Sequence, residues 1–515
     1  GYAEIRGGTF YAHACELHGH QGEGSNNAFY GLYVAGEEDE VKCVVYDGNI
    51  ISEGKYAAAL IGNDNTNGDG GINADATSEI KGGTFTATLA STPALKGAPN
   101  TGNPIITGGT FSSDVSEYVA DTASIGKDSN SGKWVVSSLT AETGVAETGG
   151  NYYSTLAAAV AAAGEGETVT LLKDVTMSDM LITRKTMTLD LGGKTLTATG
   201  ASYAVAAVAG TLTVQNGTID VTSDEGTALY AQKATIVVSD GAFIRAKNNA
   251  VQVGNCIEGE PGVYWGNVIV NDGASISGDA GVLVSGPYPV SALQADGTLL
   301  DTQSNRSTLT VNGGTISGEA YAVTGNGTYH GTTITITGGT IKQTGNVGGG
   351  ALYHPQNGTL NISGDPVLEG ESGIQLCSGE GVIANITGGT VRATGLDGRA
   401  DKTGDGFIPD GAALSVVNRN YPGGAPKMNV SGGYFSAQNN NAVLAYTWSA
   451  NAASDWAEAK QYLSITGGYF TSDPSAYTED GLTGVDSGRS DYPYTVGVKG
   501  GEVVPVAPSA SDVQA

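Results

Sequence analysis

Two loops carry oxygen-bearing side chains in an order that could bind a hard cation. One loop runs from Asn65 to Asp75 and the other from Asp401 to Asp410. In both, such side chains occupy the first, third and fifth positions, and glycine occupies the sixth. Alternate oxygens converge on Ca²⁺ in loops of this layout, and the glycine allows a sharp turn. The predicted ligands are Asn65, Asn67, Asp69 and Asp75 in the first loop, and Asp401, Thr403, Asp405, the Phe407 carbonyl and Asp410 in the second.

The calcium prediction has an alternative, because the twelfth position departs from that layout. Ala76 and Ala412 stand where such a calcium loop has glutamate. Asp75 and Asp410 would therefore have to supply the late carboxylate from shifted positions. Asparagine, aspartate and glycine are also the residues of ordinary tight turns, so both loops could equally be hairpin turns that bind nothing.

Aromatic residues in the later repeats and long loops are candidates for contact with sugars. Amphipathic rings are enriched at binding surfaces, where they combine apolar area with a polar edge. The alternative is that these rings fill the interior of the repeats or anchor the loops. The residues proposed for stacking on a glycan are Tyr353, His354, Tyr421 and Trp448.

Catalytic constellations are sparse in this sequence. Asp240 and Asp272 occupy equivalent turns of successive repeats and could form a pair of carboxylates for hydrolysis, but glycine-rich turns favour aspartate by themselves. Arg245 and Arg392 stand singly in predicted strands, so no basic cluster accompanies the pair. No nucleophile elbow, phosphate-binding loop or dinucleotide motif occurs. An enzyme is therefore less favoured than a noncatalytic protein.

The cysteines and the N-terminal histidines leave further alternatives open. His13, His18 and His20 lie beside Cys15, and these residue types suit zinc, but their spacing matches no structural zinc site and a solvated turn explains them as well. Cys15 and Cys43 could form a disulfide bond or remain reduced. Cys377 alternates like a core residue and is expected to be buried.

A repeat of about 25 residues organises most of the chain. Gly314 and its equivalent Gly339 are 25 residues apart, and apolar residues alternate with polar ones before each glycine pair. Such alternation predicts short strands, and glycine pairs predict turns between them. A repeat of this length without a helix indicates a coil of parallel strands. Residues predicted to point inward are Leu309, Val311, Ile316, Ile334, Ile336, Ile341 and Ile374; Thr310 and Thr335 are predicted to point outward.

Two capped modules are predicted along the chain. A similar tail follows the last repeat at residues 112–121 and again at residues 471–480, as expected of a C-terminal cap, which a solenoid needs to cover its last turn. Residues 154–163 predict the one convincing helix, which would close the N-terminal end of the second coil. The predicted organisation is a first coil at 1–149, a second coil at 150–505 and a linker at 506–515.

Composition excludes several classes of partner. The chain of 515 residues has 24 Lys and Arg against 52 Asp and Glu, giving a net charge of −28, so nucleic acid and anionic membranes are poor partners. No apolar run approaches the roughly 18–20 residues of a membrane span, so no membrane insertion is expected. The chain begins at Gly1 without a signal peptide, which predicts a mature form or a fragment.

The repeats resemble right-handed parallel β-helices of the pectate-lyase-like superfamily, in particular the repeat regions of large bacterial surface proteins. The resemblance rests on the phrase Gly-Gly-Thr-Phe at residues 7–10, 82–85 and 108–111, and on residues 153–175 and 186–196. It implies an all-β, right-handed parallel β-helix solenoid in two tandem coils. It also implies a secreted or bacterial cell-surface location. It implies little about activity, because one coil can host lyases, hydrolases and noncatalytic adhesins.

The function predicted from sequence is that of a noncatalytic, extracellular structural or adhesin segment that presents loops for attachment. Host or environmental glycans, or surface proteins, are the expected partners, and Ca²⁺ is the expected cofactor. The alternative is a polysaccharide-active enzyme, either a lyase or a glycoside hydrolase, or a carbohydrate-binding module on the same coil. A groove with two carboxylates on one strand face would favour the enzyme.

Overall fold

The protein divides into two compact units, Gly1–Ala162 and Ala163–Ala515. This division falls after the residue near 150 at which the sequence places the boundary. The computed structural model describes residues 2–12, 30–34, 41–53, 56–61, 76–97, 105–200, 202–254, 264–299, 305–377, 379–399, 401–419, 424–449 and 451–500. Each unit is built mainly from short strands, and each is described by itself below.

The first unit is a stack of parallel strands followed by two antiparallel pairs, β10 with β11 and β12 with β13. β1 pairs with β3, β3 with β5 and β6, β5 with β8 and β6 with β9, while β2, β4 and β7 form a second parallel sheet. The elements are β1 Tyr2–Ala12, β2 Leu32–Val34, β3 Val41–Ser52, β4 Ala59–Ile61, β5 Ala76–Ile80, β6 Thr84–Ala87, β7 Leu95–Gly97, β8 Ile105–Ile106, β9 Gly109–Phe111, η2 Ser116–Tyr118, β10 Ala123–Lys127, β11 Trp134–Ser138, β12 Ala146–Thr148, β13 Asn151–Tyr153 and α1 Leu156–Ala162.

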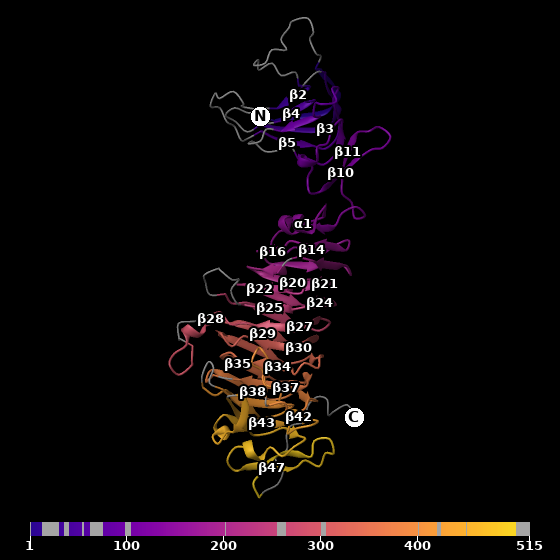
Figure 1. Ribbon diagram of the computed structural model, residues 1–515. Helices are drawn as coiled ribbons and strands as arrows, with labels where there is room; N and C mark the ends of the chain where they lie inside the picture. The colour runs from indigo at the N-terminus through magenta and orange to yellow at the C-terminus, as the bar shows by residue number, and fades with distance from the viewer. Residues whose placement is uncertain are drawn as a thin grey trace. The chain divides into compact units, whose positions relative to one another are not determined.

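Three series of parallel strands form the second unit, and the chain adds to each series in turn (Figure 1). The first series is β14 Thr168–Leu171, β17 Met187–Asp190, β20 Thr211–Gln215, β23 Thr235–Val238, β26 Asn267–Val270, β29 Ser307–Val311, β32 Thr332–Ile336, β35 Gly358–Ile362, β38 Val382–Ile386, β41 Lys427–Val430 and β45 Leu463–Ile465. The second series is β15 Val175–Met177, β18 Thr195–Ala198, β21 Gly217–Val221, β24 Ala242–Ala246, β27 Ser275–Val284, β30 Thr315–Gly325, β33 Thr340–Gln343, β36 Val367–Gly370, β39 Thr390–Ala393, β42 Tyr434–Ala437 and β46 Tyr469–Phe470.

The third series shares the long strands β27 and β30 with the second. Its other members are β16 Leu181–Thr183, β19 Tyr203–Ala207, β22 Thr227–Ala231, β25 Asn249–Val253, β34 Gly350–His354, β37 Ser372–Cys377, β40 Leu414–Asn418 and β43 Val443–Ser449. Elements outside the three series are β28 Tyr288–Pro289, η3 Val290–Ala292, β31 Tyr329–His330, β44 Ala452–Asp455, η4 Ala459–Gln461, η5 Ser475–Tyr477, β47 Leu482–Asp486 and β48 Tyr494–Val498. Strands that follow one another in three repeating parallel series are compatible with a β-helix solenoid. The all-β, parallel-strand prediction is therefore confirmed.

The interior of the second unit is filled by the residues that the alternation predicts. In the first series Leu309 pairs with Ile334, one repeat of 25 residues further along the chain. The inward positions Leu309, Val311, Ile316, Ile334, Ile336, Ile341 and Ile374 are all 0% exposed. Thr310 and Thr335, which alternate with them, are half-buried on the outer side. Stacking of equivalent side chains in successive turns thus forms a continuous apolar core.

Glycine at the predicted turns lets successive turns of the chain approach closely. A Cβ atom on Gly338 would lie 2.4 Å from the Asn312 carbonyl oxygen, a separation that no side chain tolerates. Gly339 adopts φ +83°, in the left-handed region that favours glycine. The glycine pair therefore serves both the close approach and the turn of the backbone.

In both units an antiparallel hairpin follows the last parallel strand. β10 and β11 pair with each other, and β11 pairs with the last parallel strand, β9. The same arrangement recurs with β47, β48 and β46. The repeated tails of the sequence therefore fold alike. Helix α1 lies within the predicted 154–163 segment, and the Thr155 hydroxyl accepts a hydrogen bond from the Ala158 N–H at 3.1 Å, as an N-cap residue does.

No helix among the described residues is long and apolar enough to cross a membrane.

Candidate functional site

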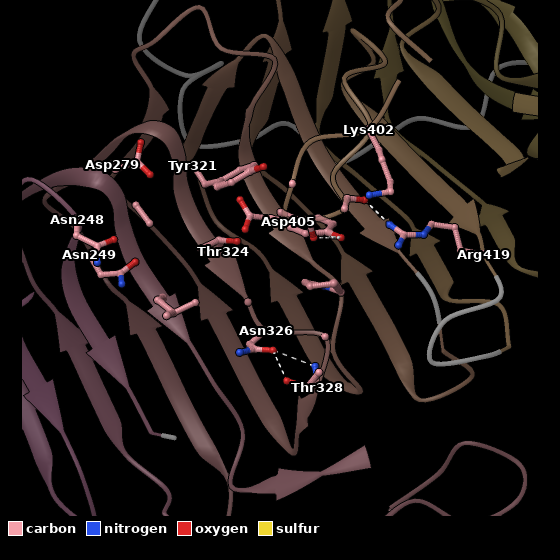
Figure 2. Close-up of a pocket in the computed structure, with 18 residues that line it drawn as sticks. Asn248, Asn249, Asp279, Tyr321, Thr324, Asn326, Thr328, Lys402, Asp405 and Arg419 are labelled. Carbon is pink, nitrogen blue, oxygen red and sulfur yellow. Dashed lines mark hydrogen bonds between the residues drawn. The ribbon is translucent and has the colours of Figure 1, made fainter. Parts of the chain in front are cut away.

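A groove of about 540 Å³ opens on the third series of strands of the second unit (Figure 2). One side carries Asn248, Asn249 and Asp279, from the start of β25 and the middle of β27. Lys402 and Arg419 lie along the opposite side. The groove combines side-chain amides and hydroxyls with carboxylates and cations, which is the mixture of a few polar groups that binding sites use to orient a ligand.

One wall of the groove is the insertion between β39 and β40, whose tip is a tight hairpin. Thr403 N–H donates to the Phe407 carbonyl at 2.8 Å, and Phe407 N–H donates to the Thr403 hydroxyl at 3.1 Å. Gly404, Asp405 and Gly406 form the turn between them and line the groove. Hydrogen bonds within the hairpin therefore stabilise this wall of the groove.

The Phe407 ring fixes this hairpin to the coil. It is fully buried and packs edge-on against Tyr321 of β30 and Tyr353 of β34, with ring centroids 5.4 and 5.3 Å away. The Tyr321 hydroxyl lies 3.0 Å from the hydroxyl of Thr403. Burial raises the pKa of Tyr321 to about 12. Edge-to-face packing of buried rings stabilises such a contact beyond the burial of apolar area.

A buried polar network anchors the base of the insertion. Gln375 of β37 accepts a hydrogen bond from Ile408 N–H at 2.9 Å and donates to the Ile408 carbonyl at 2.7 Å. Asp410 is fully buried and accepts hydrogen bonds from Gln375, from the Tyr446 hydroxyl and from Ala412 N–H, at 3.0, 3.0 and 3.1 Å. Burial raises the pKa of the Asp410 carboxyl despite these hydrogen bonds. Asp410 therefore positions the insertion from inside the protein.

The Asp279 carboxyl at the groove has two acidic neighbours, Glu319 and Asp405. The pKa of Asp279 is raised, first by burial and then by the negative charges of Glu319 and Asp405. A like charge nearby disfavours ionisation, so a raised pKa in a groove marks a candidate for proton transfer. Asp279 and Asp405 both line the groove. They come from different elements, Asp279 from β27 and Asp405 from the turn of the insertion, so they share the groove but not the single strand face expected of an enzyme.

The cations of the groove differ in how firmly they are held. The Arg419 guanidinium donates to the Gly406 carbonyl and to the Cys377 sulfur, the second contact at 3.3 Å, and it lies 5.9 Å from the centre of the Trp448 ring. Lys402 is exposed at the tip of the insertion. Arg419 therefore has a structural role in holding the insertion, and Lys402 presents its charge to solvent.

The predicted calcium ligands of the second loop do not all face one point. Asp401 and Asp405 are exposed, whereas the Asp410 side chain is held inside by Gln375 and Tyr446. The Phe407 carbonyl is already paired with Thr403 N–H, and no group of three or more His, Cys, Asp or Glu side chains in the described part of the chain is placed to hold a metal ion. A hairpin closed by its own hydrogen bonds needs no cation to form. The ligands predicted in the first loop, Asn65, Asn67, Asp69 and Asp75, lie outside the described residues.

The aromatic residues predicted to stack on sugars lie beneath the surface. Tyr353 is 2% exposed under Phe407, His354 is fully buried, and Trp448 is 7% exposed, with its indole N–H donating to the Arg399 carbonyl at 3.1 Å. Tyr421 lies outside the described residues. Buried rings offer no face to a sugar, so the structure gives the stacking prediction no support. Tyr353 alone of the described candidates borders the groove.

Other residues singled out in the sequence have structural roles. Asp240 takes φ +45°, and its N–H donates to the Asp272 carbonyl at 3.3 Å, so the pair sits at equivalent turns as predicted but interacts through the backbone. Arg245 and Arg392, expected to stand singly, each form an ion pair with a carboxylate on the neighbouring strand, Asp220 at 3.3 Å and Glu369 at 2.6 Å.

The described residues include Cys43 and Cys377 but not the other residues of the disulfide and zinc predictions. Cys43 is buried in β3, and burial raises the pKa of its thiol. Its predicted partner Cys15, with the neighbouring histidines, lies outside the described residues. Cys377 is fully buried, as expected.

Sequence reasoning missed most of the residues that line the groove, although one signal was present. Asn249 pairs with Ala280, and Ala280 pairs with Tyr321, in three successive turns. Asn248 and Asp279 stand one residue before these positions and Glu319 stands two residues before, so the three polar residues follow one corner of the coil. Aligning the turns residue by residue would have placed them together. Nothing in the sequence indicates that the insertion at 396–411 folds over the same strands.

Comparison with protein-family models, with curated proteins and with solved structures found no significant match. The class of protein is therefore assigned from its strand topology and its groove alone. It is an all-β protein with long parallel sheets, and its second unit carries a polar groove walled by an insertion.

Proposed function

We propose that this chain is a noncatalytic, extracellular surface segment whose second unit binds a glycan in the groove. The observation that carries the proposal is the groove itself, whose lining includes the side chains of Asn248, Asn249, Thr324, Asn326 and Thr328. Amides and hydroxyls both donate and accept hydrogen bonds, and so do the hydroxyl groups of a sugar. Asp279 and Asp405 add acceptors that can take two hydrogen bonds from vicinal hydroxyls.

The wider architecture supports a role in presentation rather than metabolism. We propose right-handed parallel β-helices in two tandem coils of the pectate-lyase-like kind, with α1 and the terminal hairpins as caps. An acidic, glycine-rich coil of this kind suits a secreted or bacterial cell-surface protein, because a net charge of −28 favours solubility. Its partners would be host or environmental glycans, or surface proteins that carry them.

Glycoside hydrolysis is the second candidate, favoured by one specific observation. Asp279 and Asp405 share the groove, and the pKa of Asp279 is raised by burial and by its acidic neighbours. A carboxyl group that keeps its proton longer can serve as a general acid beside an ionised partner. The two candidates share a site and differ in whether bound glycan is cleaved.

A glycan array followed by calorimetry on the hit is expected to give binding to the second unit. Asn249→Ala removes a groove amide and should weaken that binding at least about fivefold, since an unmatched buried polar group costs about 1–3 kcal/mol. Asn429→Ala is the matched control: it removes an exposed amide from β41, outside the groove, and should leave the affinity unchanged. Equal affinities for both variants would place the binding elsewhere.

The same glycan samples decide between binding and hydrolysis. We expect no new reducing ends or unsaturated products after long incubation. Their release by the wild-type chain, lost in Asp279→Asn and in Asp405→Asn but kept in Asp272→Asn, would replace the binding proposal by the hydrolase. Asp272 is a suitable control because it is exposed and lies outside the groove lining.

Calcium binding at Asp401 and Asp405 is proposed only as a weak interaction. With Asp410 held inside, the loop lacks its late carboxylate, and weak extracellular sites bind in the millimolar range. Calcium at about ten times its Kd should then stabilise the folded chain by about 1.4 kcal/mol, seen as a rise in Tm. Asp405→Ala should abolish that rise, while Asp365→Ala, which removes an exposed carboxylate elsewhere on the coil, should not. An unchanged Tm in the wild-type chain would leave the loop a simple turn.

A further inference from the structure

A buried histidine lies directly beside two segments that line the groove. His330 ends β31 and is fully buried, and Asn326 to Thr328, just before this strand, line the groove. Tyr353 and Pro355 also line it, and Gln356 and Asn357 follow them at once in the chain. The groove lining and the buried corner behind it are therefore parts of the same two short segments.

A single hydrogen bond from backbone to side chain joins these segments. Asn357 N–H donates to Nδ1 of His330 at 2.8 Å. This bond requires Nδ1 to carry no proton, so the ring is neutral with its proton on Nε2. Nε2 is buried and has no hydrogen-bond partner within the described structure. A second proton on the ring would place two donors, Nδ1–H and Asn357 N–H, against each other.

Other hydrogen bonds also hold the Asn357 corner. The Asn357 carbonyl accepts from Gly331 N–H at 2.9 Å, and the Asn357 side-chain amide donates to the Gly297 carbonyl. The Gln356 side-chain amide lies within hydrogen-bond distance of the Val284 carbonyl, at 3.2 Å, and of the Thr332 hydroxyl, at 3.4 Å. The Gln356 Oε1 and Asn357 Oδ1 atoms are buried without a hydrogen-bond partner in the part of the chain that the structure describes. Opening the corner would let water pair with these two oxygens, which offsets part of the cost of opening it.

We propose that the hydrogen bond from Asn357 to His330 is a proton-sensitive latch: protonation of His330 breaks it and releases the two segments that line the groove. Opening of the latch stands on the geometry alone. Its consequence, that acid weakens ligand binding, rests on the glycan-binding function proposed above.

The imidazole ring of His330 is the group proposed to titrate in the latch, and its titratable neighbours are as follows. The described titratable groups on β31 and its neighbouring elements are Tyr329 of β31, Tyr288 of β28, which pairs with His330, and His354 of β34. Burial lowers the pKa of His330 to about 4. Among the described residues no charged side chain opposes this shift. Burial likewise lowers the pKa of His354 to about 4.

The sign of the pH dependence follows from these values. An opened corner exposes His330, whose pKa returns to about 6.5. The closed form is favoured fully above that pH, because both forms are then neutral. As the pH falls from 6.5 toward 4 the open form takes up a proton that the closed form resists, and the opening constant rises about tenfold per pH unit. With a closed-form pKa of about 4, the total rise is roughly 300-fold.

Amide hydrogen exchange of the full chain without any ligand tests the latch. After correction for the intrinsic exchange rate, opening at Asn357 and at residues 326–331 should rise about tenfold per pH unit below 6.5. In His330→Asn the slope should vanish, because the asparagine oxygen can accept the same hydrogen bond but cannot be protonated. A flat wild-type profile, or an unchanged slope in His330→Asn, would overturn the proposal.

Two further measurements keep the result interpretable. His354→Gln should retain the slope at Asn357, and its loss would overturn the assignment to His330. If His330→Asn does not fold, ring-¹⁵N NMR of the wild-type chain replaces it. Nδ1 of His330 should then report an unprotonated acceptor that becomes protonated over the same pH range in which exchange at Asn357 rises. Protonation of Nδ1 without a change in that exchange would overturn the latch. Neither measurement uses a glycan, so a failed glycan array leaves the latch intact, and a flat exchange profile leaves the glycan proposal intact.

Discussion

Replacing Val311 with aspartate is expected to lower the free energy of unfolding of the second unit by roughly 4 kcal/mol or more. Val311 is 0% exposed in β29, where it pairs with Val270 on one side and with Ile336 on the other. An aspartate there has either an unpaired charge or an unsatisfied carboxyl group in an apolar interior. Denaturant unfolding of the full chain, followed by circular dichroism, would show a lower midpoint for the affected transition.

Thr310→Asp is the matched control for this prediction. It places the same side chain one residue earlier in the same strand, where the position is half-buried and faces outward. A surface substitution of this kind should change stability by less than about 1 kcal/mol. Equal losses at Val311 and Thr310 would contradict the assignment of the inner and outer faces, and with it the core of the second unit.

Removing the Phe407 ring is expected to cost about 3–5 kcal/mol, because Phe→Ala in a packed site loses the buried ring and leaves a cavity. The ring is fully buried between Tyr321 and Tyr353. The loss should fall on the insertion first, since Phe407 anchors the hairpin that walls the groove. Denaturant unfolding gives the size of the loss, and limited proteolysis or hydrogen exchange at residues 403–407 shows whether the hairpin is released.

Phe243→Ala gives the comparison for Phe407→Ala. Phe243 lies in β24 of the same unit and is 50% exposed, so removing the same ring there should cost less than about 1 kcal/mol. A protected hairpin in Phe407→Ala would mean that the polar network at Gln375 and Asp410 is sufficient to hold the insertion. In that outcome the aromatic contact is dispensable for the groove.

These two predictions separate the roles of the coil and of the insertion. The coil is stabilised by apolar side chains stacked in successive turns, each of which contacts only its neighbours, as in other solenoids. The insertion adds a second apolar cluster on the outer side of the third series, which includes Tyr353, Phe407, Ile408, Tyr446 and Trp448. The proposed glycan binding would depend on this second cluster, because the insertion that it attaches forms one wall of the groove.

Charge in the groove bears on which glycans it could take. The negative charges of Glu319 and Asp405 already raise the pKa of Asp279, so a further carboxylate placed there would be repelled. Lys402 and Arg419, on the opposite side, compensate part of this charge. A neutral glycan fits such a lining better than a polymer of uronic acids, and an array containing both would display that preference.

The sequence alone determined the class of fold and the inner face of the coil. Apolar and polar residues alternate around Leu309 and Val311, a glycine pair follows, and the pattern repeats after 25 residues. This local pattern predicts both the strand conformation and the side chains that point inward. Each inward position predicted from it is buried. The helix at 156–162 was equally readable, because its apolar spacing and its N-cap residue lie within one short segment.

Only the tertiary structure decided what covers the outer face. By alternation Tyr353 points away from the core, and the sequence therefore offered it to a ligand. The structure instead covers it with Phe407, 54 residues later in the chain. A local sequence pattern cannot predict such a contact. The path of a long insertion depends on contacts with residues that are distant in the sequence and become close only in the folded chain.

The same reason explains the candidate site. Asn249, Asp279, Tyr321 and Asp405 are spread over more than 150 residues and meet in one groove. Asp410 was expected to supply the late calcium carboxylate from a shifted position, yet its side chain lies inside, where Gln375 and Tyr446 donate hydrogen bonds to it. Spacing along the chain reports which side chains can converge. Their actual convergence depends on neighbouring residues that only the folded coil brings close. It also depends on whether hydrogen bonds offset the cost of burying each polar group.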